Sequence, residues 1–146
     1  MSVEDKLAIY EAIAQYSYTY DGRDADAFAQ VFLEDGVFEI VLAGATTPAV
    51  KLSSRAEIRA WAAKRLQARA GRFTSRHYQS GTVFDALTAD SAVTRTMVLV
   101  THQSAGEREP RPTLSGVYHD TWHKRADGWR LARRVAHLDR DPDAAK

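Results

Sequence analysis

The spacing of hydrophobic positions changes halfway along the chain. In residues 3–20, apolar and aromatic side chains recur every three or four positions, which predicts an amphipathic helix that Asp21-Gly22 brings to an end. From Phe73 onward, apolar residues approximately alternate with polar ones, and this period of two is typical of half-buried strands. We therefore expect helices in the first half of the chain and strands in the second.

Local signals divide the first half into shorter elements. Asp24 is placed to cap a second helix over residues 25–32, residues 34–36 form a predicted turn, and residues 37–42 are an apolar run suited to a strand. Residues 44–48 are expected to form a loop. Ser54 and Glu57 have the spacing of a capping box and precede a predicted helix that runs to about residue 68.

The second half contains four long strand candidates, at residues 73–86, 91–103, 114–124 and 129–138. Tight turns are predicted at residues 87–90 and 126–128, and a longer polar loop at residues 104–112. Consecutive hairpins form an antiparallel sheet, and helices followed by strands indicate an α+β fold. Such a sheet should curl around the helices and leave a hollow at one end, where a ligand is expected.

Composition limits the possible chemistry. The 146 residues fit one domain, with an ordered core at about residues 4–138 and a frayed tail at residues 141–146. No cysteine occurs, which excludes disulfides, thiolate metal ligands and cysteine nucleophiles. The net charge is only +1 and no dense basic run appears, so nucleic acid is not an expected partner.

The sequence contains no recognisable targeting or nucleotide-binding motif. The first residues are acidic, and no window approaches the roughly 18 apolar residues of a membrane span, so we expect a cytoplasmic protein with no membrane partner. A glycine-rich phosphate loop and a Gly-x-Ser-x-Gly motif are both missing, which argues against nucleotides and against a serine nucleophile.

Candidate chemistry begins where the first helix ends. Tyr16 and Tyr20 lie one helical turn apart, and Asp21 follows them, where a carboxylate can accept a hydrogen bond from an imidazole. The alternative is an aromatic core stripe followed by a solvated aspartate. His77 shares a predicted strand face with Phe73, Ser75, Gln79 and Val83, and on the residues alone it is either a catalytic or a structural histidine.

Other histidines and arginines leave alternatives open. His102, His119 and His123 match no metal-binding spacing, so we expect no metal site. In the last strand, strict alternation puts Arg133 on the face of Trp129, with Arg134 on the other face, unless a bulge shifts the register. An arginine on the core face needs an acidic partner or an anionic ligand.

Five segments give the chain a resemblance to the SnoaL-like branch of the nuclear transport factor 2-like superfamily. They are residues 14–24 (AQYSYTYDGRD), 32–38 (FLEDGVF), 76–78 (RHY), 116–120 (GVYHD) and 127–134 (DGWRLARR). The resemblance covers about residues 4–138. It implies a cone-shaped barrel in which helices pack on a strongly curved, mostly antiparallel sheet that encloses a cavity.

Within that branch the chain looks most similar to scytalone dehydratase, bile acid 7α-dehydratase and hexachlorocyclohexane dehydrochlorinase. The resemblance implies that Asp21 orients His77, which moves the proton, and that Tyr16, Tyr20 and Arg134 complete the catalytic set. It further implies substrate contacts from His102, His119, Tyr118 and Trp61. Near Val117 and His119 the chain lacks the serine and asparagine with which scytalone dehydratase holds its substrate, so scytalone itself is not expected.

The resemblance therefore implies a cofactor-independent lyase that carries out a dehydratase-type elimination on a small hydrophobic ring compound, polyketide-like or steroid-like. An ordinary imidazole titrates near pH 6.5 and can accept a proton at neutral pH, and a carboxylate partner strengthens it as a base. The alternatives are a polyketide cyclase or ketosteroid-isomerase-like enzyme, and a non-catalytic small subunit of a ring-hydroxylating dioxygenase. A homodimer or homotrimer is expected.

Overall fold

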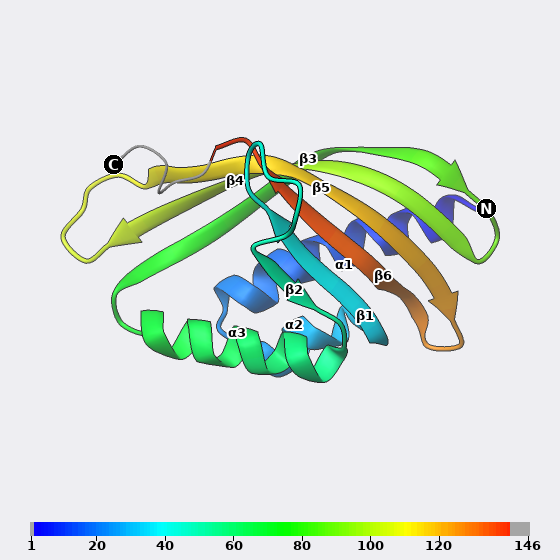
Figure 1. Ribbon diagram of the computed structural model, residues 1–146, viewed down its shortest axis with the longest axis horizontal. Coiled ribbons are helices and arrows are strands. Elements are labelled where there is room, and N and C mark those ends of the chain that lie inside the picture. Colours follow the sequence, from blue (N-terminus) through cyan, green and yellow to red (C-terminus); the bar gives the residue numbers. More distant parts are fainter. Residues whose placement is uncertain (1, 141–146) are drawn as a thin grey trace.

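The computed structural model describes residues 2–140, and the predicted frayed tail at residues 141–146 lies outside them. Its three helices are α1 (Val3–Asp21), α2 (Ala25–Gln30) and α3 (Arg55–Arg69), close to the predicted spans (Figure 1). Ser54 caps α3 by accepting a hydrogen bond from the Glu57 backbone N–H at 3.1 Å. The Glu57 carboxylate in turn accepts from the backbone N–H of Ser53 at 2.7 Å, which fixes the start of the helix.

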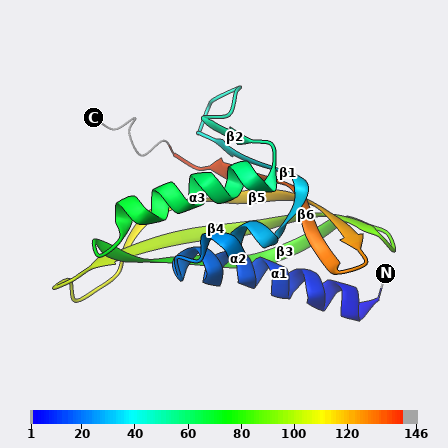
Figure 2. The same cartoon turned by 90° about the horizontal axis from the view of Figure 1, so that it is seen from below.

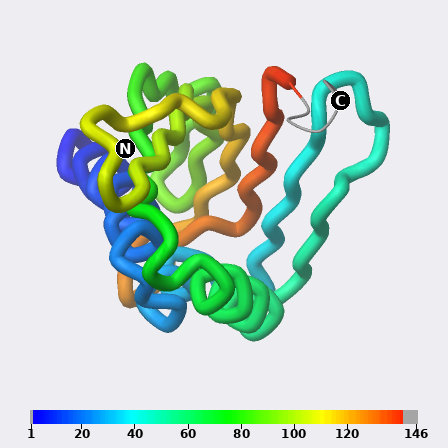
Figure 3. Tube along the Cα trace, turned by 90° about the vertical axis from the view of Figure 1, so that its left-hand side faces the viewer, coloured from blue at the N-terminus to red at the C-terminus, as the bar shows by residue number. Residues whose placement is uncertain are grey.

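Six strands form one sheet, in the order β2-β1-β6-β5-β4-β3. They are β1 (Phe32–Val41), β2 (Val50–Leu52), β3 (Phe73–Leu87), β4 (Ser91–Ser104), β5 (Arg111–Arg125) and β6 (Gly128–Leu138). The predicted antiparallel meander from β3 to β6 is confirmed. β1 lies parallel to β6, so the sheet is mixed, and its two edge strands β2 and β3 do not meet (Figure 3). The expected α+β fold, with helices packed on a strongly curved and mostly antiparallel sheet, is confirmed, and the sheet stays open at its edges.

Two details of β1 and β2 differ from the sequence prediction. The predicted turn at residues 34–36 is part of β1, whose register against β6 shifts between Phe32 and Val37. The Glu-Asp-Gly signal therefore marks a bulge within a strand rather than the end of one. β2 was not predicted, because three residues are too short for a recognisable alternation.

The helices cover one face of the sheet (Figure 2), and the core lies between the two layers. Several of its large side chains have no exposed surface: Ile9, Phe28, Phe32, Ile58, Trp122 and Leu131. Burying each of them favours folding by roughly 1.5–3 kcal/mol before the entropy cost of ordering is subtracted. Among the described residues, no helix has the length and apolar character needed to cross a lipid bilayer.

Two bulges decide which side chains face the helices. In β6, Ala132 stands unpaired between Leu131, which pairs with Trp122, and Arg133, which pairs with Thr121. This extra residue turns Arg133 outward and buries Arg134, so the bulge alternative is confirmed.

In β3 a second irregularity lies at Gly81, whose φ of 68° is in the left-handed region. Val83, predicted on the face of His77, is therefore 44% exposed. Strict alternation was wrong at this position because the bulge changes the register.

Candidate active site

Asp21 and His77 form a hydrogen-bonded pair where the end of α1 meets the start of β3. The Oδ1 atom of Asp21 lies 2.7 Å from Nδ1 of His77, and its Oδ2 atom accepts from the His77 backbone N–H at 2.8 Å. The Ser75 hydroxyl donates to Oδ1 at 2.8 Å. The side chains of Asp21 and His77 are 6% and 13% exposed, so both are held in a largely dry place.

The charge of Asp21 determines which tautomer the His77 imidazole adopts. Burial by itself would raise the pKa of Asp21, but the hydrogen bonds from His77 and Ser75 outweigh it and hold that pKa below its ordinary value. Asp21 is thus a carboxylate at neutral pH, and Nδ1 of His77 carries the hydrogen that it accepts. In neutral His77 the lone pair is then on Nε2, which forms no hydrogen bond with any residue from 2 to 140.

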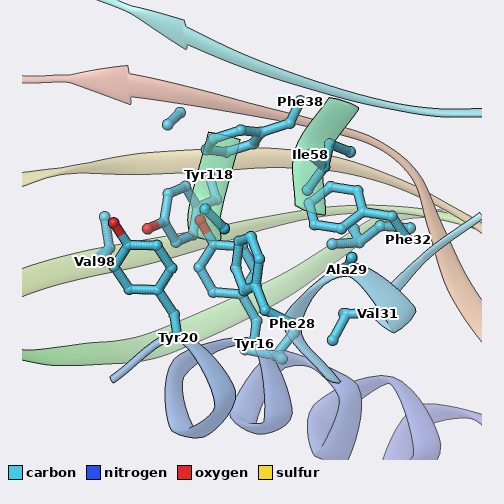
Figure 4. Close-up of a cluster of buried hydrophobic side chains, with 14 of the residues drawn as sticks. Tyr16, Tyr20, Phe28, Ala29, Val31, Phe32, Phe38, Ile58, Val98 and Tyr118 are labelled. Carbon is cyan, nitrogen blue, oxygen red and sulfur yellow. The ribbon is translucent and has the colours of Figure 1, made fainter. Parts of the chain in front are cut away.

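Aromatic rings surround the imidazole. The ring centroid of His77 lies 5.1 Å from that of Tyr20 and 6.5 Å from that of Tyr16. Trp61 of α3 continues this lining, with its ring 6.3 Å from Tyr20. Tyr16 and Tyr20 rise from α1 toward the sheet, and Tyr118 of β5 approaches them from the other side (Figure 4). The side chains of Tyr16, Tyr20 and Tyr118 are 4–5% exposed, so all three lie in the space between the helices and the sheet.

Arg134 is fully buried behind two of these tyrosines. Its Nε and Nη2 atoms each donate to Asp120 at 2.8 Å. The guanidinium carbon lies 4.2 Å from the ring centroid of Tyr16 and 4.0 Å from that of Tyr118. Burial opposes the charge of Arg134, but the attraction of Asp120 outweighs it and raises the pKa of the guanidinium. The structure therefore pairs Arg134 with Asp120 and not with Asp21.

Burial also determines the protonation state of the phenol groups of Tyr16 and Tyr118. It raises the pKa of Tyr16 well above the ordinary value, and the neighbouring Tyr118 adds to the effect. Burial raises the pKa of Tyr118 as well, although the Arg134 charge opposes it. Both side chains remain neutral at physiological pH and can donate hydrogen bonds.

The structure brings His102 to this cluster and leaves His119 outside it. His102 pairs across the β3–β4 ladder with Ser75 and stacks on Phe73, with ring centroids 4.1 Å apart. Burial, followed by the charge of Arg69, lowers its pKa, so it is neutral at pH 7. His119 is exposed on the opposite face of β5 from Tyr118, beside His137 at 4.6 Å. Successive side chains of β5 point to opposite faces of the sheet, so His119 cannot share the inner face with Tyr118.

Two contributors were not among the sequence-predicted site residues. Ser75 anchors Asp21, and Asp120 neutralises Arg134. Alternation could have found both, because Ser75 shares the face of His77, and Asp120 shares the face of Tyr118. The pairing of Asp120 with Arg134 could not be derived, because it depends on the bulge at Ala132.

A recess of about 550 Å³ lies between α1 and β3 and reaches His77 from the free edge of the sheet. Its lining includes Tyr10, Ser17 and Gln79. Gln79 bridges the two elements by donating to the Ser17 hydroxyl at 2.8 Å and to the Ile13 carbonyl at 2.9 Å. Within the described residues, no three His, Asp or Glu side chains are grouped so that they could hold a metal ion.

Solved structures with the same fold include proteins of different assigned roles. A candidate scytalone dehydratase from Novosphingobium aromaticivorans is 25% identical, with a TM-score of 0.74 over 93% of this chain and 85% of that one. ActVI-ORFA from Streptomyces coelicolor is 23% identical, with a TM-score of 0.80 over 92% of this chain and 94% of that one. The β subunit of a candidate aromatic-ring-hydroxylating dioxygenase from Novosphingobium aromaticivorans is 20% identical, with a TM-score of 0.77 over 94% and 90%.

Sequence comparison gives the family. None of the curated proteins matches the chain. The family model for the SnoaL-like domain matches residues 1–135, which is nearly the whole chain, and the solved structures agree with it in fold. The chain belongs to the SnoaL-like domain family.

Proposed function

We propose that this protein is a cofactor-independent lyase that carries out a dehydratase-type elimination on a small hydrophobic ring compound, polyketide-like or steroid-like. The observation that carries the proposal is the bond of 2.7 Å between Asp21 and Nδ1 of His77, which leaves Nε2 beside aromatic rings with no hydrogen-bond partner in residues 2–140. A positioned imidazole of this kind is a suitable general base for a proton bound to carbon. The 25% identity to a candidate scytalone dehydratase adds support.

The reaction requires a proton to leave carbon and a hydroxyl group to leave the neighbouring carbon. Nε2 of His77 takes the proton from a carbon next to a carbonyl group, and the electrons of that C–H bond move onto the carbonyl oxygen as an enolate. They then return to form the carbon–carbon double bond as the C–O bond on the neighbouring carbon breaks. The imidazolium then returns its proton to the departing hydroxyl, which leaves as water. Asp21 stays ionised throughout and stabilises the charged imidazolium.

The tyrosines stabilise the negative charge that develops on the carbonyl oxygen. Tyr16 and Tyr118 are buried neutral phenols, and Tyr20 lies closest to the imidazole. A preorganised hydrogen-bond donor in a dry site is worth about 100-fold or more in rate. Arg134 acts from behind Tyr16 and Tyr118 and does not touch the substrate, because Asp120 and the two rings enclose it.

Two variants test the dyad. His77→Ala removes the base and Asp21→Asn removes its charged partner, so both should lower turnover by at least about 100-fold on a substrate found by screening ring hydroxyketones. His119→Ala is the control, because His119 lies on the outer face of the sheet. Full turnover by either dyad variant would contradict the proposal.

The mass of the product separates the proposed reaction from its nearest rival. A cyclase or ketosteroid-isomerase-like enzyme could use the same dyad, but it would leave the mass of the substrate unchanged, whereas elimination removes one water. A product of unchanged mass whose formation needs His77 would replace the lyase proposal with the isomerase or cyclase one.

The second alternative to the lyase proposal is a non-catalytic, structural role. The dioxygenase β subunit named above shares the fold, and the outer sheet face of this chain exposes Tyr78, Met97 and Leu99 by 42–56%. We propose that this face serves a homodimer or homotrimer in the cytoplasm. Light scattering on the purified chain measures its own assembly, and co-purification of a large iron-containing subunit would instead favour the structural role.

A further inference from the structure

Two arginines of α3 lie against the aromatic lining of the site. Trp61, Arg65 and Arg69 follow one another at four-residue spacing and so share one face of the helix. The Arg65 guanidinium lies 5.3 Å from the ring centroid of Trp61, and the Arg69 guanidinium lies 5.6 Å from that of Phe73. Figure 3 looks onto this end of the molecule, where α3 (green) leads into β3 and the β4–β5 loop (yellow) lies nearby.

These aromatic residues connect the arginines to the dyad. Trp61 packs beside Tyr20, whose ring lies 5.1 Å from that of His77. Phe73 stacks on His102, which pairs with Ser75 across the strands. Arg69 is close enough to Tyr20 and to His102 for its charge to act on both. The two cations therefore lie beside the aromatic residues that connect to His77.

In the part of the chain that the structure describes, the side chains of Arg65 and Arg69 form no ion pair and no hydrogen bond. Other arginines do have acidic partners, namely Arg59, Arg95, Arg111, Arg130, Arg133 and Arg134. Arg69 is only partly exposed, and burial together with the like charge of Arg65 lowers its pKa. A partly desolvated cation beside a second cation is unfavourable until an anion joins them.

We infer that the ligand of this site is a ring compound that carries a carboxylate, which Arg69 binds with help from Arg65. The planar guanidinium matches a carboxylate through two parallel hydrogen bonds, and the ring of the ligand would lie on Trp61 and Phe73, which are both partly exposed. His102 is neutral, so it adds a polar edge without adding charge. The inference rests on the proposed function only in placing the ligand beside His77.

The test uses binding, so that it does not depend on turnover. Probes are 2-naphthoate, its neutral amide 2-naphthamide, and 2-naphthyl phosphate, each titrated into the full chain by calorimetry. The naphthoate should bind more tightly than the amide, and Arg69→Met should weaken naphthoate binding by about 10-fold or more while leaving amide binding unchanged. Arg69→Lys keeps the positive charge but loses the two parallel N–H donors of the guanidinium, so it should weaken naphthoate binding less than Arg69→Met does.

Lys64→Met is the matched control, because Lys64 is exposed on the same helix and forms no ion pair with any described residue. Equal binding of naphthoate and amide, or an equal effect of Arg69→Met and Lys64→Met, would overturn the inference. Preference for the naphthyl phosphate would overturn the assignment of a carboxylate. His77→Ala should lose turnover but keep naphthoate binding, so this variant tests the proposed function. A lost preference for the carboxylate in Arg69→Met tests the binding inference separately.

Discussion

Arg134 and Asp120 are joined by two hydrogen bonds of 2.8 Å, and neither side chain has any exposed surface. Two aromatic faces enclose the guanidinium, and its Nη1 atom has no hydrogen-bond partner among residues 2–140. A charge pair this deep is stable only while both members are present, because each one would otherwise be an uncompensated buried ion.

Removing one member of the pair should therefore destabilise the protein strongly. Arg134→Met should lower the free energy of unfolding by about 3–5 kcal/mol, measured by urea denaturation, because Asp120 is left buried without a counter-charge. The double variant Arg134→Met/Asp120→Leu should recover part of that loss. A single variant as stable as the parent would show that water or a rearrangement compensates Asp120.

Acid should weaken the contact between α1 and β3. The hydrogen bonds of His77 and Ser75 hold the pKa of Asp21 below 3.8, so the stability that Asp21 contributes is present above pH 3.8 and is lost as the pH falls through its lowered pKa. Asp21→Asn should be less stable than the parent at neutral pH, and the difference should shrink in acid. Denaturation of both proteins between pH 2 and pH 7 measures this. A constant difference would contradict it.

A side chain at Gly81 should destabilise the protein. The φ of Gly81 is 68°, and an added Cβ would collide with the terminal methyl group of Met97. Gly81→Ala should cost about 1–2 kcal/mol for the backbone conformation and more for the collision. Gly44→Ala is the matched control, because Gly44 has a φ of 76° and open space around it. Equal thermal unfolding of the two variants would show that Met97 moves aside freely.

The phenol groups can be tested one at a time. Tyr16→Phe should keep the ring that packs on Arg134 and lose only the hydroxyl, so turnover should fall by about 100-fold with little change in thermal stability. Burial raises the pKa of Tyr16, so this phenol should stay protonated between pH 7 and pH 10. The activity of the unmodified protein should therefore show no loss from ionisation of Tyr16 over that range. Tyr18→Phe serves as the control, since Tyr18 is 77% exposed.

Much of the fold follows from local patterns. The helices begin at Ser2, Asp24 and Ser54 because each of these residues caps a backbone N–H, and the four long strands follow the alternation of their residues. The parallel pairing of β1 with β6 could not be predicted, because it depends on how the long connection through β2, α3 and the strands β3–β5 returns the chain to β1. The open edge of the sheet could not be predicted for the same reason.

The candidate site divides in a similar way. Tyr16, Tyr20 and His77 lie on the inner faces that helical and strand periodicity assign to them. The burial of Arg134 needed the bulge at Ala132, which no local signal places at that residue. His119 was included through resemblance, although its own alternation with Tyr118 puts it on the outer face.

The bond between Asp21 and the backbone N–H of His77 has a consequence for solubility. β3 is an edge strand, and the His77 N–H points away from β4 to accept a carboxylate where another strand would otherwise add. Exposed edge N–H groups are templates for the pairing of one molecule with the next. The same carboxylate that holds the imidazole thus blocks the sheet from growing at this point, so protection against aggregation and the geometry of the dyad depend on one side chain.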